Sequence, residues 1–246
     1  MKEERVFPFM IKLILVFIAF LGLAAGLLVA AKRAGIRDDL PISQFPERTF
    51  VIDAGHGGRD GGAVGISGAV EKDIDLAISK KVYLLITLCG RNAIMTRTQD
   101  EMLDLPGTQG NLKGRDIRSR IKIADETPDS MLVSIHVNSF PSEKYRGFQV
   151  FYSTSDPASQ ITAERIRQTC TRFLPEAGNR EIKQASSSIY LLNNVKSPAI
   201  LIECGFISNA EEEKLLCDNS YQNRLCAVIC SGLISDAPSE NKDSGV

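Results

Sequence analysis

The chain has 246 residues, of which 43% are hydrophobic and 24% are charged, and this length suits one globular domain of about 200 residues. The formal net charge is −1, so the chain lacks the basic excess that is typical of nucleic-acid-binding proteins. The six cysteines form no C-x-x-C pair, which argues against a cysteine-rich structural zinc site. We interpret most of them as small buried hydrophobic residues, although export from the cytoplasm would permit a disulfide.

The N-terminal segment is the most hydrophobic part of the chain. Leu13–Ala31 is an unbroken run of 19 apolar or glycine residues, and as a helix it would be about 28 Å long, close to the thickness of a bilayer core. We predict that residues 1–31 form a signal peptide or a membrane anchor, and that the rest of the chain is exported. The alternative is a buried core helix, which rarely stays apolar on every face over such a length.

Residues 32–47, which contain charges and two prolines, are predicted to form a linker, and residues 236–246 a disordered tail. In the intervening segment, 48–235, strands and helices alternate. The predicted strands are Thr49–Ile52, Ala93–Thr96, Met131–His136, Phe148–Tyr152 and Ala199–Glu203. The predicted helices are Glu71–Leu88, Asp116–Glu126, Pro157–Phe173, Ala210–Leu216 and Tyr221–Ile234, and residues 100–113 are predicted to form a surface loop. This alternation predicts an α/β domain with a mostly parallel sheet that helices cover on both faces.

Three of these strands run into side chains that can bind a metal ion. The first leads to His56, the third to His136 and the fifth to Glu203, while Glu71 opens the helix that follows the first strand. Sites in open α/β sheets form outside the carboxyl ends of the strands, so we expect these side chains to meet at one edge. Two histidines and one carboxylate, with an open position for water, are typical of a catalytic zinc site.

The glycines around His56 are interpreted as allowing a sharp turn and as leaving space for a metal ion and a substrate. Asp53 or a backbone carbonyl is a candidate partner for the second ring nitrogen of a histidine ligand, and Asp53 is equally a candidate cap for the turn.

Other interpretations of the same residues fit less well. The stretch GHGGRDGG matches neither common phosphate-binding glycine pattern. A cysteine nucleophile at Cys204 would have to act beside His136, but strand alternation directs Cys204 away from the face that Glu203 occupies. Glu203 could instead cap a helix or form a salt bridge. Ending an apolar strand with a carboxylate is costly, which favours a functional role.

Four stretches together resemble the zinc-dependent N-acetylmuramoyl-L-alanine amidases of the bacterial cell wall, the Amidase_3 family. They are VIDAGHGGRDGGAVG, EKD at Glu71–Asp73, SIHVNSF and LIECGFISN, in the order found in the family. The resemblance covers about residues 49–234. In addition, SSSIYLLNN followed by PAILIECGFISN is similar to the sporulation amidases of this family.

The resemblance implies that His56, Glu71 and His136 bind Zn²⁺, that Glu203 is the catalytic base, and that Asn138 contacts the substrate or supports the site. It implies a twisted, mostly parallel sheet flanked by helices. The substrate would be the amide that joins the lactyl group of N-acetylmuramic acid to L-alanine of a peptidoglycan stem peptide. The reaction would serve spore cortex maturation and muramic lactam formation, or alternatively turnover of the vegetative wall.

The expected location is outside the cytoplasm, in the cell wall or the forespore intermembrane space, with membrane contact through the N-terminal segment and a possible activating partner protein. One alternative is a non-catalytic peptidoglycan-binding regulator, but an intact Glu203 has no use in a binding module. Another is a different zinc hydrolase, although the chain has no H-E-x-x-H motif.

Overall fold

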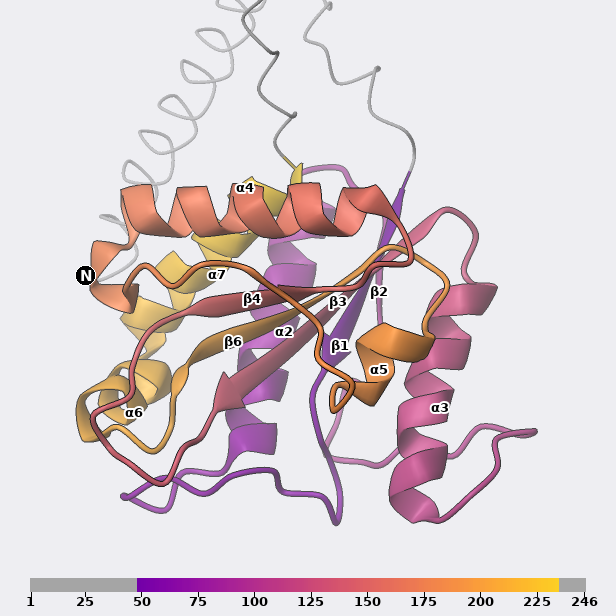
Figure 1. Ribbon diagram of the computed structural model, residues 1–246, viewed down its shortest axis with the longest axis horizontal. Coiled ribbons are helices and arrows are strands. Elements are labelled where there is room, and N and C mark those ends of the chain that lie inside the picture. Colours follow the sequence, from indigo (N-terminus) through magenta and orange to yellow (C-terminus); the bar gives the residue numbers. More distant parts are fainter. Residues whose placement is uncertain (1–47, 235–246) are drawn as a thin grey trace, which may run out of the picture. The chain divides into compact units, whose positions relative to one another are not determined.

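The computed structural model describes residues 48–234 of the chain (Figure 1). The predictions for residues 1–31, 32–47 and 236–246 lie outside the described residues, and they stay predictions. Within residues 48–234, no helix combines the length and the apolar character needed to cross a membrane.

In the described part of the chain, six strands form one sheet in the order β2-β1-β3-β6-β4-β5. The strands are β1 (Thr49–Ala54), β2 (Ala93–Met95), β3 (Ser130–Asn138), β4 (Gln149–Tyr152), β5 (Lys183–Gln184) and β6 (Ala199–Phe206). Neighbouring strands are parallel except β4 and β6, which are antiparallel. The predicted α/β class with a mostly parallel sheet is confirmed.

Helices cover both faces of this sheet (Figure 1). They are α2 (Glu71–Leu88), α3 (Leu112–Glu126), α4 (Pro157–Phe173), α5 (Tyr190–Asn194), α6 (Ala210–Cys217) and α7 (Asn219–Ile234), with a short 3₁₀ helix at Pro175–Ala177. Apolar side chains of α2, α4 and α7 share one hydrophobic core, and those of α3 and α5 share the other. The two-layer covering explains why the central strands are apolar on both faces.

Each central strand supplies side chains to both cores, because successive residues of a strand point to opposite faces. In β3, Val133 packs in the core beneath α2, α4 and α7, whereas Leu132 packs beneath α3 and α5. In β6, Ile202 packs in the core beneath α2, α4 and α7, and Leu201 packs beneath α3 and α5. All four side chains are less than a tenth exposed, and full burial of a side chain of this size contributes about 1.5–3 kcal/mol.

Several boundaries differ from the predictions. Helix α3 begins at Leu112 rather than Asp116, because the side chain of Asn111 caps it by accepting a hydrogen bond from the backbone of Gly114 at 2.9 Å. The predicted loop therefore ends two residues early. Strand β5 and helix α5 are missing from the predictions, because elements of two and five residues carry almost no periodicity.

The prediction that His136 and Glu203 end their strands is wrong. β3 continues to Asn138 and β6 to Phe206, with a shift in register between His136 and Asn138. Beyond it, the backbone of Ile207 donates to the carbonyl of Asn138 at 2.8 Å. Backbone pairing does not depend on side-chain polarity, so the two strands stay together after their apolar residues have ended.

Candidate active site

The turn after β1 places His56 in an unusual backbone conformation. Its φ angle is 55°, in the left-handed region, and Gly57 and Gly58 follow at 133° and 56°. A non-glycine residue in this region persists only where its surroundings hold it there.

Two buried arginines supply that support. Arg97 donates to the carbonyls of Ala54 (3.0 Å) and Gly55 (2.7 Å). Arg120 donates to the carbonyls of Ala54 and His56, both at 2.5 Å. Their guanidinium groups therefore hold three successive carbonyls of the turn. Sequence reasoning missed both, because an isolated arginine carries no signal that distinguishes it from a surface residue.

The glycines of this region make room for protein side chains. A Cβ atom at Gly55 would lie 2.4 Å from Cε1 of His136, and one at Gly62 would lie 2.5 Å from Oε2 of Glu71. The interpretation that the glycines leave space for substrate is thus wrong for these two positions. The chain needs glycine there because the rings and carboxylates of the site occupy the space of a side chain.

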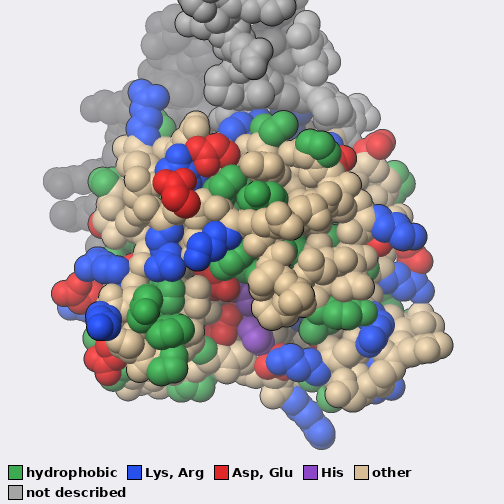
Figure 2. All heavy atoms as spheres, in the orientation of Figure 1, with side chains coloured by type: hydrophobic (Ala, Val, Ile, Leu, Met, Phe, Trp, Pro, Cys, Tyr) green, Lys and Arg blue, Asp and Glu red, His purple; other side chains and the backbone are tan. Residues whose placement is uncertain are grey.

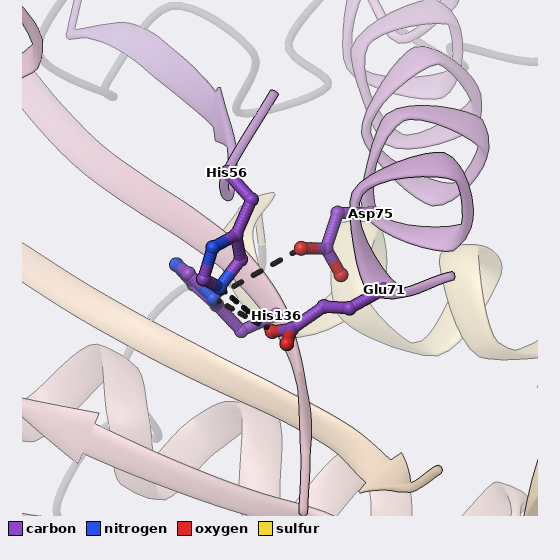
Figure 3. Close-up of side chains that lie close together, drawn as sticks. All are labelled: His56, Glu71, Asp75 and His136. Atoms are coloured by element: carbon purple, nitrogen blue, oxygen red, sulfur yellow. Dashed lines mark hydrogen bonds and ion pairs between the residues drawn. The ribbon is translucent and has the colours of Figure 1, made fainter. Parts of the chain in front are cut away.

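Four side chains from distant parts of the sequence converge beside this turn (Figure 3). Oε1 of Glu71 lies 3.1 Å from Nε2 of His56 and 3.1 Å from Nδ1 of His136. Asp75, one helical turn after Glu71 in α2, has Oδ2 at 3.9 Å from Nδ1 of His136. One donor atom of each residue can be chosen so that all lie within 4.8 Å of one another. The structure therefore brings together the three predicted metal ligands and adds Asp75, which the sequence did not indicate.

A backbone hydrogen bond and an ion pair orient these donors. The second carboxylate oxygen of Glu71 accepts from the backbone of Ala63 at 2.7 Å, which leaves Oε1 for the two histidines. Nδ1 of His56 lies 3.1 Å from Asp60, whose other oxygen is 3.2 Å from Nζ of Lys113. Asp60 thus occupies the position that carboxylates take behind histidine ligands of metals.

The suggested role of Asp53 as a partner of a histidine ligand is not supported. Its carboxylate instead accepts from Arg120 (2.6 Å), Thr96 (2.7 Å) and Ser134 (2.6 Å). Burial opposes ionisation of Asp53, but the charge of Arg120 and the two hydroxyl donors outweigh it and lower the pKa of this carboxyl. Asp53 therefore anchors the arginine that holds the turn.

Electrostatics in the cluster favour an ionised Glu71. Burial alone would raise its pKa, but the hydrogen bonds and charges of His136 and His56 hold it well below its usual range. Burial acts to lower the pKa of His56, and the carboxylates of Glu71 and Asp60 raise it overall. For Asp75, burial and the nearby negative charges of Glu71 and Glu203 raise the pKa well above normal.

The donor set fits a zinc ion. Two ligands that are each about 2.0–2.1 Å from a tetrahedral Zn²⁺ are about 3.3 Å apart, close to the separations of Glu71 from the two histidines. Neither carboxylate oxygen of Asp75 has a hydrogen-bond partner, although the residue is fully buried. Buried polar atoms are rarely left unsatisfied, so this lack of partners is also consistent with a positive charge in the cluster.

Glu203 lies beside the cluster, in β6, where it pairs in register with His136 of β3. Its Oε2 atom is buried without a hydrogen-bond partner. Burial raises the pKa of Glu203 to about 7, against the opposing charge of His136. Near neutral pH such a carboxyl can both take up and release a proton, which is what a general base that later acts as an acid requires. Asn138 ends β3 two residues beyond His136 and is partly buried.

A pocket of about 160 Å³ opens beside both histidines. Its opposite wall is formed by the start of α3, at Lys113, and by the segment before and within α5, at Ser188 and Tyr190. In Figure 2 a histidine side chain is visible at the bottom of this depression. Helix α5, which sequence reasoning missed, thus forms part of one wall of the site.

The competing interpretations lose support in the structure. Cys204 packs in the core opposite the Glu203 face, and burial raises the pKa of its thiol well above normal, so it is unsuited to be a nucleophile. The amides of Gly57, Gly58 and Ala63 already bind protein oxygens, which leaves no phosphate cradle in this loop.

Four of the six cysteines are buried and none forms a disulfide.

Comparison with known proteins agrees with this geometry. Residues 50–235 match the Amidase_3 family, described as N-acetylmuramoyl-L-alanine amidase. A germination-specific N-acetylmuramoyl-L-alanine amidase of Bacillus subtilis is 36% identical over 197 residues, which cover 79% of this chain and 81% of that protein. The amidase LytC of the same organism is 28% identical over 76% of this chain, but over only 35% of its own length.

Solved structures show the same fold. The CwlD amidase from Clostridioides difficile, determined in complex with the GerS lipoprotein, is 37% identical and superposes with a TM-score of 0.69 over 76% of this chain and 96% of that one. The catalytic domain of CwlV, an amidase from Bacillus (Paenibacillus) polymyxa, is 32% identical with a TM-score of 0.64 over 76% of this chain and 96% of that one. The chain therefore belongs to the Amidase_3 family of N-acetylmuramoyl-L-alanine amidases.

Proposed function

We propose that this chain uses Zn²⁺ to hydrolyse the amide between the lactyl group of N-acetylmuramic acid and L-alanine of peptidoglycan stem peptides. The observation that carries this proposal is the pairing of His136 with Glu203, because it puts a carboxyl with a pKa of about 7 beside a group of zinc-type ligands. His56, Glu71 and His136 would hold the ion. When bound, Zn²⁺ supplies a Lewis acid that polarises the substrate carbonyl and lowers the pKa of water.

The other steps fall to residues of the chain. Glu203 accepts a proton from the attacking water and then donates it to the departing nitrogen of L-alanine, so that the amine leaves neutral. Asp60 holds the ring of His56 through Nδ1, and the Ala63 amide holds the carboxylate of Glu71. Asn138, just beyond His136, is proposed to contact the substrate.

The similarity to the germination-specific amidase supports a narrower role in the spore cortex. There the enzyme would strip stem peptides from glycan, after which a separate deacetylase would permit muramic δ-lactam to form. The CwlD–GerS complex supports a partner protein for this chain as well. We place the reaction outside the cytoplasm, with residues 1–31 as the signal peptide or membrane anchor.

The test uses the full-length chain in mild detergent, loaded with zinc and incubated with purified peptidoglycan from vegetative cells or from spore cortex. Mass spectrometry should detect free stem peptides that begin with L-alanine, together with peptide-free glycan. Cleavage of cortex alone supports the sporulation role, and equal cleavage of both materials supports a role in the vegetative wall.

If neither material is cut while one zinc ion stays bound per chain, the experiment is repeated with a GerS-type lipoprotein added. Continued inactivity in that case would contradict the proposal and favour a peptidoglycan-binding regulator.

A further inference from the structure

Two exposed aromatic side chains lie together in the loop between β3 and β4. The ring centroids of Phe140 and Tyr145 are 4.3 Å apart, and the side chains are 47% and 41% exposed. Behind them, Tyr145 stacks on the buried ring of Phe206 with a centroid distance of 6.4 Å. We call Phe140 and Tyr145 the aromatic pair. Together they form an exposed apolar patch in which the two rings are tilted by 56° to each other, and exposed patches of this kind often mark binding sites.

The loop that carries the aromatic pair is held in place. The backbone amide of Phe140 donates to Oγ of Ser208 at 3.0 Å, and the side chain of Asn209 donates to the carbonyl of Glu143 at 2.6 Å. At the far end of the loop, the amide of Gly147 donates to the buried carboxylate of Glu212 at 2.9 Å. These bonds tie the loop to α6 and its preceding turn, so the rings are positioned before any ligand arrives.

The aromatic pair lies on the loop that leaves β3 shortly after the proposed ligand His136. Phe140 follows the proposed ligand His136 by four residues, which limits the separation of their Cα atoms to about 14 Å. Phe206, which supports the pair, follows Glu203 by three residues in β6 and pairs with Asn138. Figure 2 shows hydrophobic side chains gathered over the β3–β4 loop, beside the depression in which a histidine is visible.

The two sides of the site differ in chemistry. The side formed by α3 and α5 carries the cation Lys113, and Arg118 lies over the ring of Tyr190 with 5.5 Å to the centroid. The side formed by the β3–β4 loop presents the aromatic pair, with Lys144 and Arg146 on either side of Tyr145 in the sequence. The cleaved amide of the proposed reaction joins an uncharged pyranose, through its lactyl group, to a peptide with carboxylates, so the substrate brings an apolar sugar face as well as charged groups.

We propose that the aromatic pair is a saccharide subsite, which stacks against the C–H face of a glycan sugar and holds the strand on the β6 side of the metal cluster. This inference rests on the proposed function. Aromatic rings provide rigid apolar surface, and burying a sugar face against them removes that surface from water. Rings tilted by 56° present two apolar surfaces for a sugar, and two side chains alone offer less area than a stable protein–protein interface buries.

The experiment compares the full-length, zinc-loaded wild type with the double variant F140A/Y145A. The substrate is a soluble glycan oligomer that carries stem peptides, and KM and kcat are followed by release of peptide. Peptide-free glycan of the same length is added as a competing ligand. Because stacking acts on substrate and transition state alike, we expect KM and the inhibition constant of the peptide-free glycan to rise about tenfold, or about 1.4 kcal/mol, with kcat and bound zinc unchanged.

Two control variants distinguish loss of the saccharide subsite from general damage to the folded protein. Phe173→Ala removes another exposed phenylalanine, in α4, and should leave both constants at their wild-type values. The conservative variant Tyr145→Phe keeps both rings and should behave as wild type. An unchanged KM in F140A/Y145A would overturn the subsite, even if activation by a partner protein were lost. If the wild type released no peptide, either alone or with a GerS-type lipoprotein, the proposed function would fail first and the subsite with it.

Discussion

His136 and Glu203 face each other on the neighbouring parallel strands β3 and β6, in direct register. Strand alternation turns both side chains toward the face that α3 and α5 cover, while the adjoining Ile135 and Cys204 turn into the opposite core. A proposed metal ligand and a proposed proton carrier are thus held by the two central strands of the sheet. Their relative position is set by backbone hydrogen bonds, which single side-chain substitutions do not disturb.

This pairing predicts that Glu203→Gln removes turnover but not metal. Glutamine keeps the shape of the side chain, yet it cannot accept and return a proton, so kcat should fall about 10²–10⁴-fold. Metal content per chain, measured by atomic emission, should equal that of the wild type. Glu211→Gln, a change of an exposed acid in α6, is the matched control and should retain activity. Normal kcat in Glu203→Gln would exclude Glu203 as the base.

Glu71→Ala should lose metal and turnover together. Its Oε1 atom lies 3.1 Å from a ring nitrogen of each histidine. Removing this carboxylate leaves two nitrogen ligands that no shared carboxylate holds in place. Dialysis of the wild type against a chelator should likewise abolish activity, and stoichiometric zinc should restore it. Full activity of the chelated wild type would rule out a catalytic metal.

Asp60→Asn tests the support behind His56. An uncharged amide cannot form the ion pair that Asp60 makes with Nδ1 of His56, so the ring of His56 should become a weaker ligand. Loss of such a partner typically reduces metal affinity about 10–100-fold. Competition with a zinc indicator dye measures this directly. Asp104→Asn, which removes an exposed acid paired with Arg115, should leave zinc affinity unchanged, and a similar drop in both variants would point to long-range charge instead.

Gly55→Ala should displace the ring of His136. The new methyl group would lie 2.4 Å from that ring, and overpacking of this kind typically costs about 1–3 kcal/mol. We expect a fall in zinc affinity in a protein that still folds, as judged by circular dichroism. At Gly61 an added Cβ would lie 3.4 Å from its nearest neighbour, so Gly61→Ala is the tolerated control. Wild-type zinc affinity in Gly55→Ala would show that His136 is not a ligand.

Asp53→Asn should destabilise the fold near neutral pH. It breaks the buried pair with Arg120, and removal of one partner from such a pair typically costs about 3–5 kcal/mol. The pKa of Asp53 is lower in the folded chain than its unfolded value of 3.8, so its contribution is complete above 3.8 and declines as the pH falls through the folded pKa.

Urea denaturation should therefore show a large difference between wild type and Asp53→Asn at about pH 7, and a smaller one at about pH 3. Glu126→Gln, an exposed acid in α3, serves as the control for nonspecific charge effects. A difference that did not depend on pH would mean that the hydroxyl contacts of Asp53, rather than its charge, stabilise the turn.

Much of the fold was predictable from local patterns. The helices Glu71–Leu88 and Pro157–Phe173 have the predicted boundaries, because each is long and one begins with a clear cap at Asp156. The strand positions follow from apolar runs. The polar residues after β1 and within β3 and β6 stand out against these runs, so the pattern of residues along the chain is enough to indicate His56, His136 and Glu203 as candidates.

The supporting residues were not recognisable in this way. Asp60, Asp75, Arg97 and Arg120 are ordinary charged residues in the sequence, and only folding puts them within 4 Å of polar atoms of the turn or the cluster. The same holds for Asn111, whose capping role depends on the backbone of α3.

The class of the fold and the residues that would carry chemistry follow from the amino-acid sequence, because hydrophobic periodicity and its interruptions are local properties of a chain. Which carboxylate lies behind His56, why glycine is required at Gly55, and which elements line the site depend on the folded structure. Those relationships join residues that are far apart in sequence, such as Gly55 with His136, and their physical cause is close packing and burial, which exist only once the sheet and its helices have assembled.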